Sequence, residues 1–201
     1  MPRDRLPRRP SSPATSYAGQ TGGVTPTLDW QPAHDHLDLV APPVAKAIEQ
    51  LGGLAGVEVA EIDPALADTE ALCAHYGLPL ADSANCVVVA AKRGGVTTYA
   101  ACVVLATTRA DVNKLVRRHL DARKATFAPL DAVVEATAME YGGITPVGLP
   151  PEWRILVDAA VATHRAAVVG SGVRHSKLRL PGAALAALPN AEVLAELGRV
   201  P

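Results

Sequence analysis

Residues 141–148 read Tyr-Gly-Gly-Ile-Thr-Pro-Val-Gly, and this stretch is the most informative in the chain. It places three glycines and one proline within seven residues, directly after a run with helical spacing. Proline fixes φ and removes a hydrogen-bond donor, whereas glycine permits positive φ and a close approach to the backbone. The stretch is therefore either a plain turn or a loop that presents peptide N–H groups to a small polar ligand.

Elements on both sides of this loop can be predicted from the periodicity of apolar residues. On its N-terminal side, residues 129–139 favour a helix that has Pro129 in its first turn. A strand at 124–128 precedes it, after an amphipathic helix at 111–120 whose polar face carries Lys114, Arg117 and Arg118. On the C-terminal side, a second glycine-rich turn, Gly170-Ser171-Gly172, follows an apolar run typical of a strand.

The centre of the chain gives a hairpin signal, because Gly94-Gly95 separates β-rich runs at 85–91 and 97–106. Both runs are continuously apolar, which predicts strands covered on both faces. The other predicted elements are helices at 43–51, 69–76, 183–188 and 192–197, and strands at 57–62, 155–157, 166–169 and 177–180. Hairpins mixed with irregularly placed helices favour an α+β fold.

Composition limits the class of protein. The 201 residues suit one domain, and a chain that is 49% hydrophobic but only 3% aromatic must build its core from Ala, Val and Leu. A net charge of −1 gives no overall field that attracts nucleic acid. Three widely spaced cysteines predict reduced thiols and a cytoplasmic protein, and no run is long enough for a membrane span.

Residues 1–33 differ from the rest, since four arginines lie among prolines and are followed by Ser and Gly. This composition predicts a disordered basic tail, with the folded domain at 34–201. Such an arm is either solvated or in contact with RNA.

Motifs for chemistry are largely missing. There is no GxSxG, HExxH, GxGxxG or P-loop sequence, and we expect neither a metal nor a cofactor. Cys86 lies in an apolar strand, which favours a buried, unreactive thiol. Arg174 and Lys177, at the second glycine-rich turn, either bind a phosphate or carboxylate or form a solvent-exposed pair.

The order of these segments resembles the YbaK/EbsC family, the domain also associated with prolyl-tRNA synthetase. The likeness spans about residues 42–198 and is most specific over 125–150, ATFAPLDAVVEATAMEYGGITPVGLP. Arg123-Lys124 matches a Lys-Lys pair of the family, Thr137-Ala138 matches Thr-Gly, and Gly142–Gly148 matches Gly-Gly-Ile-Ser-Pro-x-Gly. Gly170-Ser171-Gly172 is a weaker match.

The resemblance implies a YbaK-like α+β domain with a curved, mainly antiparallel sheet flanked by helices. It also implies trans-editing, the hydrolysis of the ester in mischarged aminoacyl-tRNA without a protein nucleophile. A loop backbone orients the ester, as fixed donors can stabilise charge on a carbonyl oxygen. The pocket residues it implies are Gly142, Gly143, Thr145, Pro146 and Gly148, with Gly170, Ser171 and Gly172 facing them.

One position departs from the family, which has a functional lysine where this chain has Asn85. The resemblance implies that Asn85 contacts the terminal adenosine or its phosphate, and that Lys114, Arg117 and Arg118 meet the acceptor stem. The expected partners are aminoacyl-tRNA and an aminoacyl-tRNA synthetase, with no role for DNA or a membrane. Two alternatives stay open: a catalytically silent module that binds a small ligand or a protein, and hydrolysis of a different ester or amide.

Overall fold

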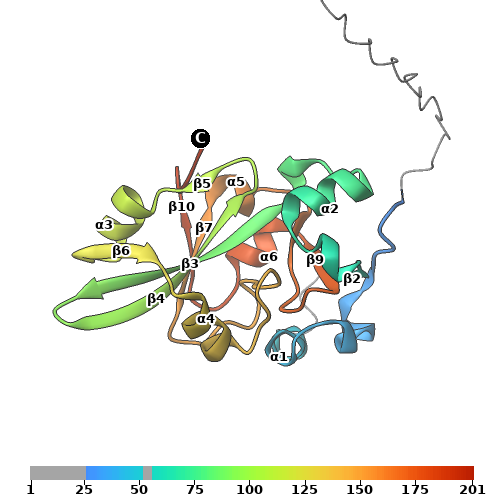
Figure 1. The fold of residues 1–201 in the computed structure, drawn as a ribbon, viewed down its shortest axis with the longest axis horizontal. Helices are drawn as coiled ribbons and strands as arrows, with labels where there is room; N and C mark the ends of the chain where they lie inside the picture. Colours follow the sequence, from blue (N-terminus) through green and yellow to red (C-terminus); the bar gives the residue numbers. More distant parts are fainter. Residues whose placement is uncertain (1–25, 52–55) are drawn as a thin grey trace, which may run out of the picture.

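A long hairpin forms the centre of the fold (Figure 1). In this computed structural model, which describes residues 26–51 and 56–201, β3 (Ala84–Arg93) and β4 (Val96–Leu105) pair antiparallel over their whole length. Gly94 and Gly95 connect them with φ of 56° and 83°. Two successive positive φ values give a turn whose twist suits a two-residue hairpin, so the predicted hairpin is confirmed.

Two larger sheets are built around this hairpin. The first has the order β10-β7-β4-β3-β6, in which β4, β7 and β10 run parallel and β3 and β6 antiparallel to their neighbours. The second has the order β1-β2-β9-β8 and is antiparallel throughout. A parallel bridge between Ser83 and Val168 connects the two sheets. The remaining strands are β1 (Gln31–Pro32), β2 (Glu58–Glu61), β5 (Arg109–Ala110), β6 (Lys124–Phe127), β7 (Arg154–Asp158), β8 (Ala167–Gly170), β9 (Ser176–Leu180), β10 (Ala191–Leu194) and β11 (Gly198–Arg199).

Short helices surround the sheets, and α3 and α4 lie on either side of β6 (Figure 1). The α-helices are α1 (Pro42–Gln50), α2 (Thr69–Tyr76), α3 (Arg117–His119), α4 (Leu130–Thr137), α5 (Ala159–Ala162) and α6 (Gly182–Ala186). A π-helical turn at Val112–Val116 leads into α3, and 3-10 helices occupy Ala33–Asp35, Leu37–Leu39, Pro64–Leu66 and Leu80–Asp82. The α+β class with mainly antiparallel pairing is confirmed. None of the helices in the described part of the chain could span a bilayer.

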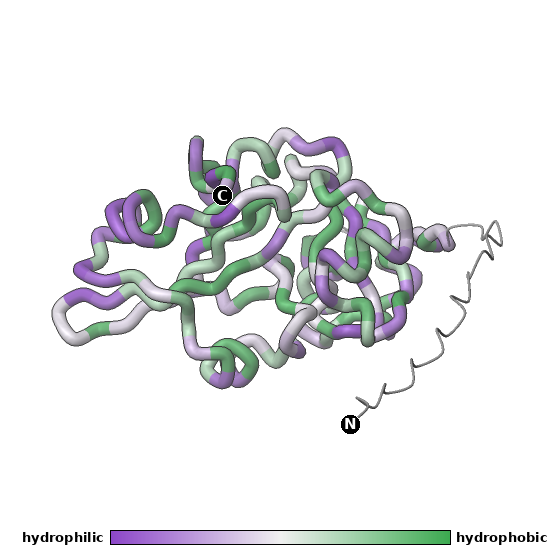
Figure 2. The backbone as a smooth tube through the Cα atoms, turned by 45° about the horizontal axis from the view of Figure 1, so that its top comes forward, coloured by the Kyte–Doolittle hydropathy of each residue, from purple (hydrophilic) through white to green (hydrophobic). Residues whose placement is uncertain are grey.

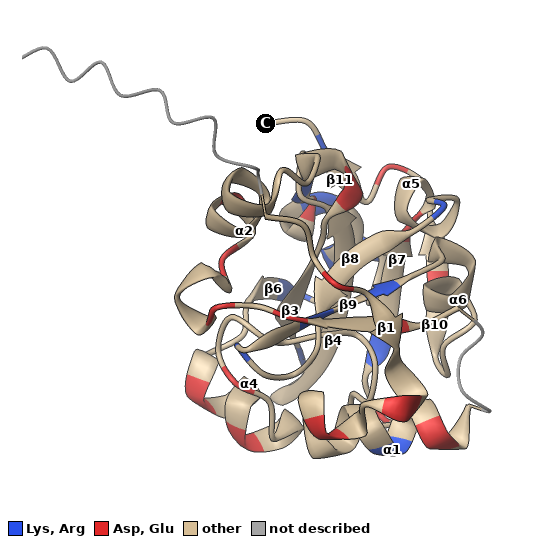
Figure 3. Ribbon diagram, turned by 90° about the vertical axis from the view of Figure 1, so that its right-hand side faces the viewer, with Lys and Arg blue, Asp and Glu red and all other residues tan. Residues whose placement is uncertain are grey.

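The core consists mainly of Ala, Val and Leu, as the composition predicts. Its largest cluster joins α1 to both sheets through side chains such as Val44, Val103 and Leu178, all with no exposed surface. Apolar segments accordingly run through the middle of the molecule (Figure 2), while many charged residues lie on the outer helices and turns (Figure 3).

Three sequence predictions need correction. Residues 192–197 do not form a helix, because Ala191–Leu194 pairs with β7 as β10. The amphipathic segment 111–120 buries Val112 and Val116 as predicted, but half of it, Val112–Val116, is π-helical. Order also begins before His34, since β1 already pairs with Glu58 and Val59. Residues 1–25 of the predicted tail lie outside the described residues.

Candidate functional site

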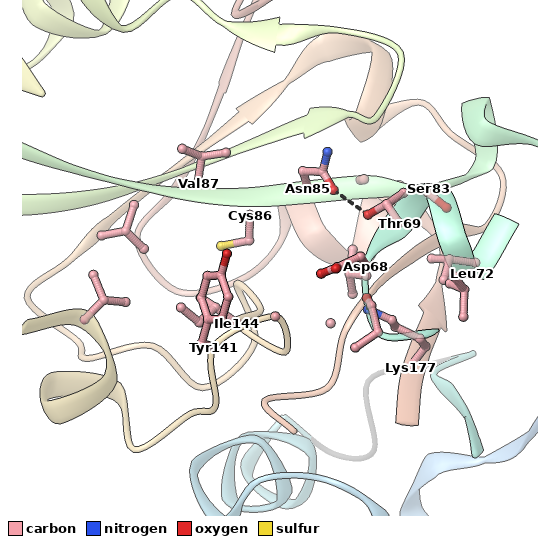
Figure 4. A pocket seen from close by; sticks show the side chains of 18 of the residues that line it. Asp68, Thr69, Leu72, Ser83, Asn85, Cys86, Val87, Tyr141, Ile144 and Lys177 are labelled. Carbon is pink, nitrogen blue, oxygen red and sulfur yellow. Dashed lines mark hydrogen bonds between the residues drawn. The ribbon is translucent and has the colours of Figure 1, made fainter. Parts of the chain in front are cut away.

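A cavity of about 640 Å³ opens beside β3, between the two sheets (Figure 4). Within the described residues, β6 pairs only with Val89–Lys92 of β3, and β8 bridges this side of the hairpin only at Ser83, just before β3 begins. The segment Ala84–Val87 therefore has β4 on one side and the cavity on the other. A strand edge of this kind exposes peptide N–H and C=O groups that a ligand can pair with.

Five parts of the chain supply the wall of the cavity. They are the start of α2, the edge of β3, the segment from β6 into α4, the glycine-rich loop, and the ends of β8 and β9. Leu72, Val88, Val133, Ile144 and Val168 make its apolar part, whereas Asp68, Thr69, Asn85 and Lys177 make its polar part. An apolar hollow with a few convergent polar groups is the usual form of a small-molecule site.

Asn85 lies at the polar end of the cavity, where α2 begins. The Thr69 hydroxyl donates a hydrogen bond of 2.9 Å to the side-chain oxygen Oδ1 of Asn85, and the side-chain nitrogen of Asn85 points away from Thr69 (Figure 4). That amide is free to donate to a bound group, although without the charge of a lysine.

Lys177 brings a positive charge to the same end of the cavity. It comes from β9, is 6% exposed, and its ammonium donates a 2.6 Å hydrogen bond to the carbonyl oxygen of Ala67. Burial lowers the pKa of Lys177 to about 8; the nearby Asp68 opposes this shift and Arg174 adds to it. The sequence identified Lys177 as a candidate anion ligand but not that it lines the same cavity as Asn85.

Arg174, the other candidate cation of that turn, serves a different purpose. Its guanidinium donates to the carbonyl oxygens of Pro64 and Tyr141, and its own N–H donates to the Glu140 carboxylate. Arg174 therefore fastens the glycine-rich loop to the segment before α2 and does not line the cavity.

The glycine-rich loop contributes its first half to the cavity. Gly142 and Ile144 line it, together with Gly170 from the second turn. Thr145 is completely buried, and its hydroxyl has no hydrogen-bond partner among the described residues. Pro146 and Gly148 line a separate hollow next to α1. Of the five predicted catalytic residues, Gly142 alone lines the cavity, Pro146 and Gly148 line the other hollow, and Gly143 and Thr145 line neither of the two.

The two glycine-rich turns are packed against each other. Gly172 donates a 2.7 Å hydrogen bond to the Gly143 carbonyl, and a Cβ on Gly143 would lie 2.5 Å from the carbonyl oxygen of Val173. Gly143 is therefore required for contact between backbones, not only for ligand approach. Ser171 is buried and donates to the carbonyl oxygen of Ser176, so its hydroxyl does not reach the cavity.

The predicted RNA-binding residues lie beyond β6. Lys114, Arg117 and Arg118 are exposed and surround a shallow hollow. β6 begins shortly after this basic surface and ends with Phe127 at the cavity. The strand thus connects the two predicted sites.

The cysteine and the serine that line the cavity are poorly suited to act as nucleophiles. Cys86 lines the cavity and is half-buried, and loss of hydration raises the pKa of its thiol far above the usual range, with a further contribution from Cys102. The Ser83 hydroxyl is buried and lies 3.4 Å from the Cys73 sulfur. In the described part of the chain, no three His, Cys, Asp or Glu side chains cluster as metal ligands.

Comparison with known proteins defines the class to which this fold and cavity belong. A family profile described as "Aminoacyl-tRNA editing domain" matches residues 63–188. The chain therefore belongs to the family of aminoacyl-tRNA editing domains, and the resemblance to YbaK-like proteins is confirmed. No curated protein matches it.

Solved structures share the fold at low sequence identity. The hypothetical protein APE2540 has a TM-score of 0.68 and 19% identity over 78% of this chain and 99% of its own. A candidate trans-editing enzyme for prolyl-tRNA synthetase has a TM-score of 0.65 and 19% identity, and the match covers 78% of this chain and 97% of that enzyme. A scaffold from a computational epitope-grafting study has a TM-score of 0.65 and 21% identity, and the match covers 77% of this chain and 95% of the scaffold.

Proposed function

We propose that this chain hydrolyses the ester of mischarged aminoacyl-tRNA in trans. The observation that carries the proposal is the cavity at the free edge of β3. Peptide groups of β3, Asn85 and Lys177 all line this cavity, within an editing-domain fold.

The reaction needs only a positioned water molecule and donors for the carbonyl oxygen. Water attacks the ester carbon, the bond to the ribose oxygen breaks, and the ribose oxygen takes up the proton. Negative charge develops on the carbonyl oxygen, where fixed N–H donors and a nearby cation stabilise it most. We assign this task to Asn85 and Lys177, because both line the cavity and can donate hydrogen bonds. Water is the attacking group in this proposal, because Cys86 and Ser83 are unsuited to attack.

The loop positions the substrate with its first half and supports the cavity with its second. Gly142 and Gly170 face the cavity and leave room for the ester and its ribose. Gly143 and Gly172 hold the two turns together, whereas Thr145, Pro146 and Gly148 fix the loop against the core. Positioning of this kind can provide much of the rate enhancement.

The basic surface formed by Lys114, Arg117 and Arg118 is assigned to the acceptor stem, and β6 leads from it to the cavity. An aminoacyl-tRNA synthetase would supply the mischarged substrate in the cytoplasm. The free thiols of Cys73, Cys86 and Cys102 agree with that reducing compartment.

A panel of mischarged tRNAs tests the proposal, with release of free amino acid as the readout. Wild type should release at least one amino acid faster than the spontaneous rate, and Lys177→Met and Asn85→Ala should be slower. Lys92→Met is the matched control, since Lys92 is exposed on β3 outside the cavity. Spontaneous rates throughout the panel would contradict the proposal.

Asn85 in place of the family lysine favours a second candidate, a binding module of the same fold that lacks activity. In that case, wild type would bind aminoacyl-tRNA or a small amino-acid-like ligand, and the ester would persist at its spontaneous rate.

A further inference from the structure

The mouth of the cavity holds an unusual pair of aromatic side chains. The chain contains seven aromatic residues, including a single Phe. That residue, Phe127, is 69% exposed at the end of β6, and Tyr141 is 63% exposed at the start of the glycine-rich loop. Both line the cavity. In a chain with so few aromatic residues, placing its only Phe in solvent suggests a purpose other than packing.

The other aromatic residues of the described chain are packed. The Tyr99 and Trp153 rings stack with their centroids 5.1 Å apart, and Arg179 covers the ring of Trp30. Tyr76 packs against an apolar cluster that includes Leu72. Among the Phe, Tyr and Trp rings of the described residues, only those of Phe127 and Tyr141 are exposed.

The surroundings indicate what these rings bind. An exposed aromatic face stacks well on a nucleobase, and proteins that hold single-stranded nucleic acid combine such rings with a positively charged track for the backbone. The exposed cations Lys114, Arg117, Arg118 and Lys124 lie along the segment that leads into and begins β6, and Phe127 ends that strand. Beyond the rings, the cavity contains the charged Lys177.

We propose that Phe127 and Tyr141 form a stacking site for the terminal base of a single-stranded 3′ end. The identification of that base as the terminal adenine of aminoacyl-tRNA rests on the proposed function. In this arrangement the rings hold the base at the mouth, and the attached ribose and ester enter the cavity beside Asn85.

Binding of the trinucleotide CCA tests the site without any hydrolysis. Loss of one base–aromatic stack costs about 1–3 kcal/mol, so Phe127→Ala and Tyr141→Ala should each weaken binding about 5- to 150-fold. Phe127→Trp and Tyr141→Phe keep a ring and should retain affinity. Val96→Ala is the matched control, because Val96 is 63% exposed at the hairpin tip and does not line the cavity.

A second measurement separates this site from the proposed hydrolysis. With aminoacyl-tRNA, the alanine variants should raise KM, whereas the hydrolysis of an aminoacyl ethyl ester, which has no base, should not change. If CCA does not bind, or binds equally well to wild type and both alanine variants, the stacking site is refuted even if wild type is an active deacylase. If CCA binding depends on the rings but no tRNA is deacylated, the stacking site stands and the proposed hydrolysis fails.

Discussion

Lys177 and Asn85 come from strands of different sheets, yet they line one end of the same cavity. Asn85 provides an uncharged amide from β3, and Lys177 provides a charged ammonium from β9. Because Lys177 is buried, its charge is weakly screened by water and acts strongly on a nearby anion or oxyanion. The same burial makes that charge sensitive to pH.

The first prediction concerns this pH dependence. Lys177 is charged below its folded pKa of about 8 and loses its proton as the pH rises through that value. We therefore expect kcat/KM of wild type to fall above about pH 8, after subtraction of spontaneous hydrolysis. Lys177→Arg should remove this fall, because a guanidinium stays charged. An identical fall in wild type and Lys177→Arg would exclude Lys177 as its cause.

Unfolding provides an independent check. The pKa of Lys177 is lower in the folded protein than its ordinary value of 10.5, so the unfolded chain binds more protons between these two values. The contribution of Lys177 to the free energy of unfolding should therefore rise between about pH 8 and about pH 10.5. We expect to see it as an increase in the difference in unfolding free energy between wild type and Lys177→Met over this range.

The second prediction moves the charge between the two positions. A hydrogen bond to a charged group is worth about 1–2 kcal/mol more than a neutral one, which corresponds to roughly tenfold in rate. Lys177→Met should slow deacylation by about that factor, and Asn85→Lys added to it should restore the rate. Asn85→Lys alone should accelerate the reaction, and Asn85→Ala should slow it. If the double variant Lys177→Met/Asn85→Lys were as slow as Lys177→Met, a lysine at position 85 could not replace the charge of Lys177.

At the scale of elements, the basic surface before β6 gives the third prediction. Each lost phosphate contact lowers the slope of log affinity against log salt by about one unit. Reversal of Lys114, Arg117 and Arg118 to Glu should thus weaken tRNA binding and flatten its salt dependence, measured by titration at several salt concentrations. Unchanged binding at low salt would place the RNA surface elsewhere.

The end of α4 gives the fourth prediction. Ala138 caps this helix with φ of 52°, a left-handed conformation that suits glycine. Ala138→Gly should raise the free energy of unfolding by about 1 kcal/mol. Ala187→Gly is the control, since Ala187 is also an exposed cap but has φ of −93°, and it should not stabilise. Equal effects of both changes in a denaturant titration would contradict the argument.

Local signals predicted several elements well. Gly94-Gly95 located the hairpin, and Gly77 ends α2 with φ of 64° as expected. The prediction of a helix at 192–197 was wrong because an apolar run of that length suits a helix or a strand. Only pairing with the distant β7 decides between the two.

The site was harder to predict than the elements. The sequence identified Asn85, the glycine-rich loop and the basic surface. It did not reveal that Lys177 and Asn85 line the same cavity, that Phe127 and Tyr141 also line it, or that Pro146 and Gly148 line another hollow. These placements depend on how two sheets join, which no local pattern encodes.

At the scale of the whole molecule, the segment before His34 is part of the fold. Leu28 and Trp30 pack on a cluster that includes Leu72, a residue of the cavity wall. The guanidinium of Arg179 lies 4.5 Å from the Trp30 ring centroid and also forms a 2.7 Å ion pair with Glu58. The N-terminal segment therefore helps to hold together the sheet that supplies Lys177.

The last prediction compares two truncations. Deleting residues 2–33 removes Leu28, Trp30 and β1, whereas deleting 2–25 removes none of the contacts described above. A half-buried Trp ring with a cation on its face is worth about 2 kcal/mol. For a chain of this size each kcal/mol corresponds to about 2–4 °C. The longer deletion and Trp30→Ala should thus lower the thermal midpoint by at least about 4–8 °C, whereas the shorter deletion should leave it unchanged. If the two truncations unfolded at the same temperature, the folded domain would begin at His34, as the sequence alone suggested.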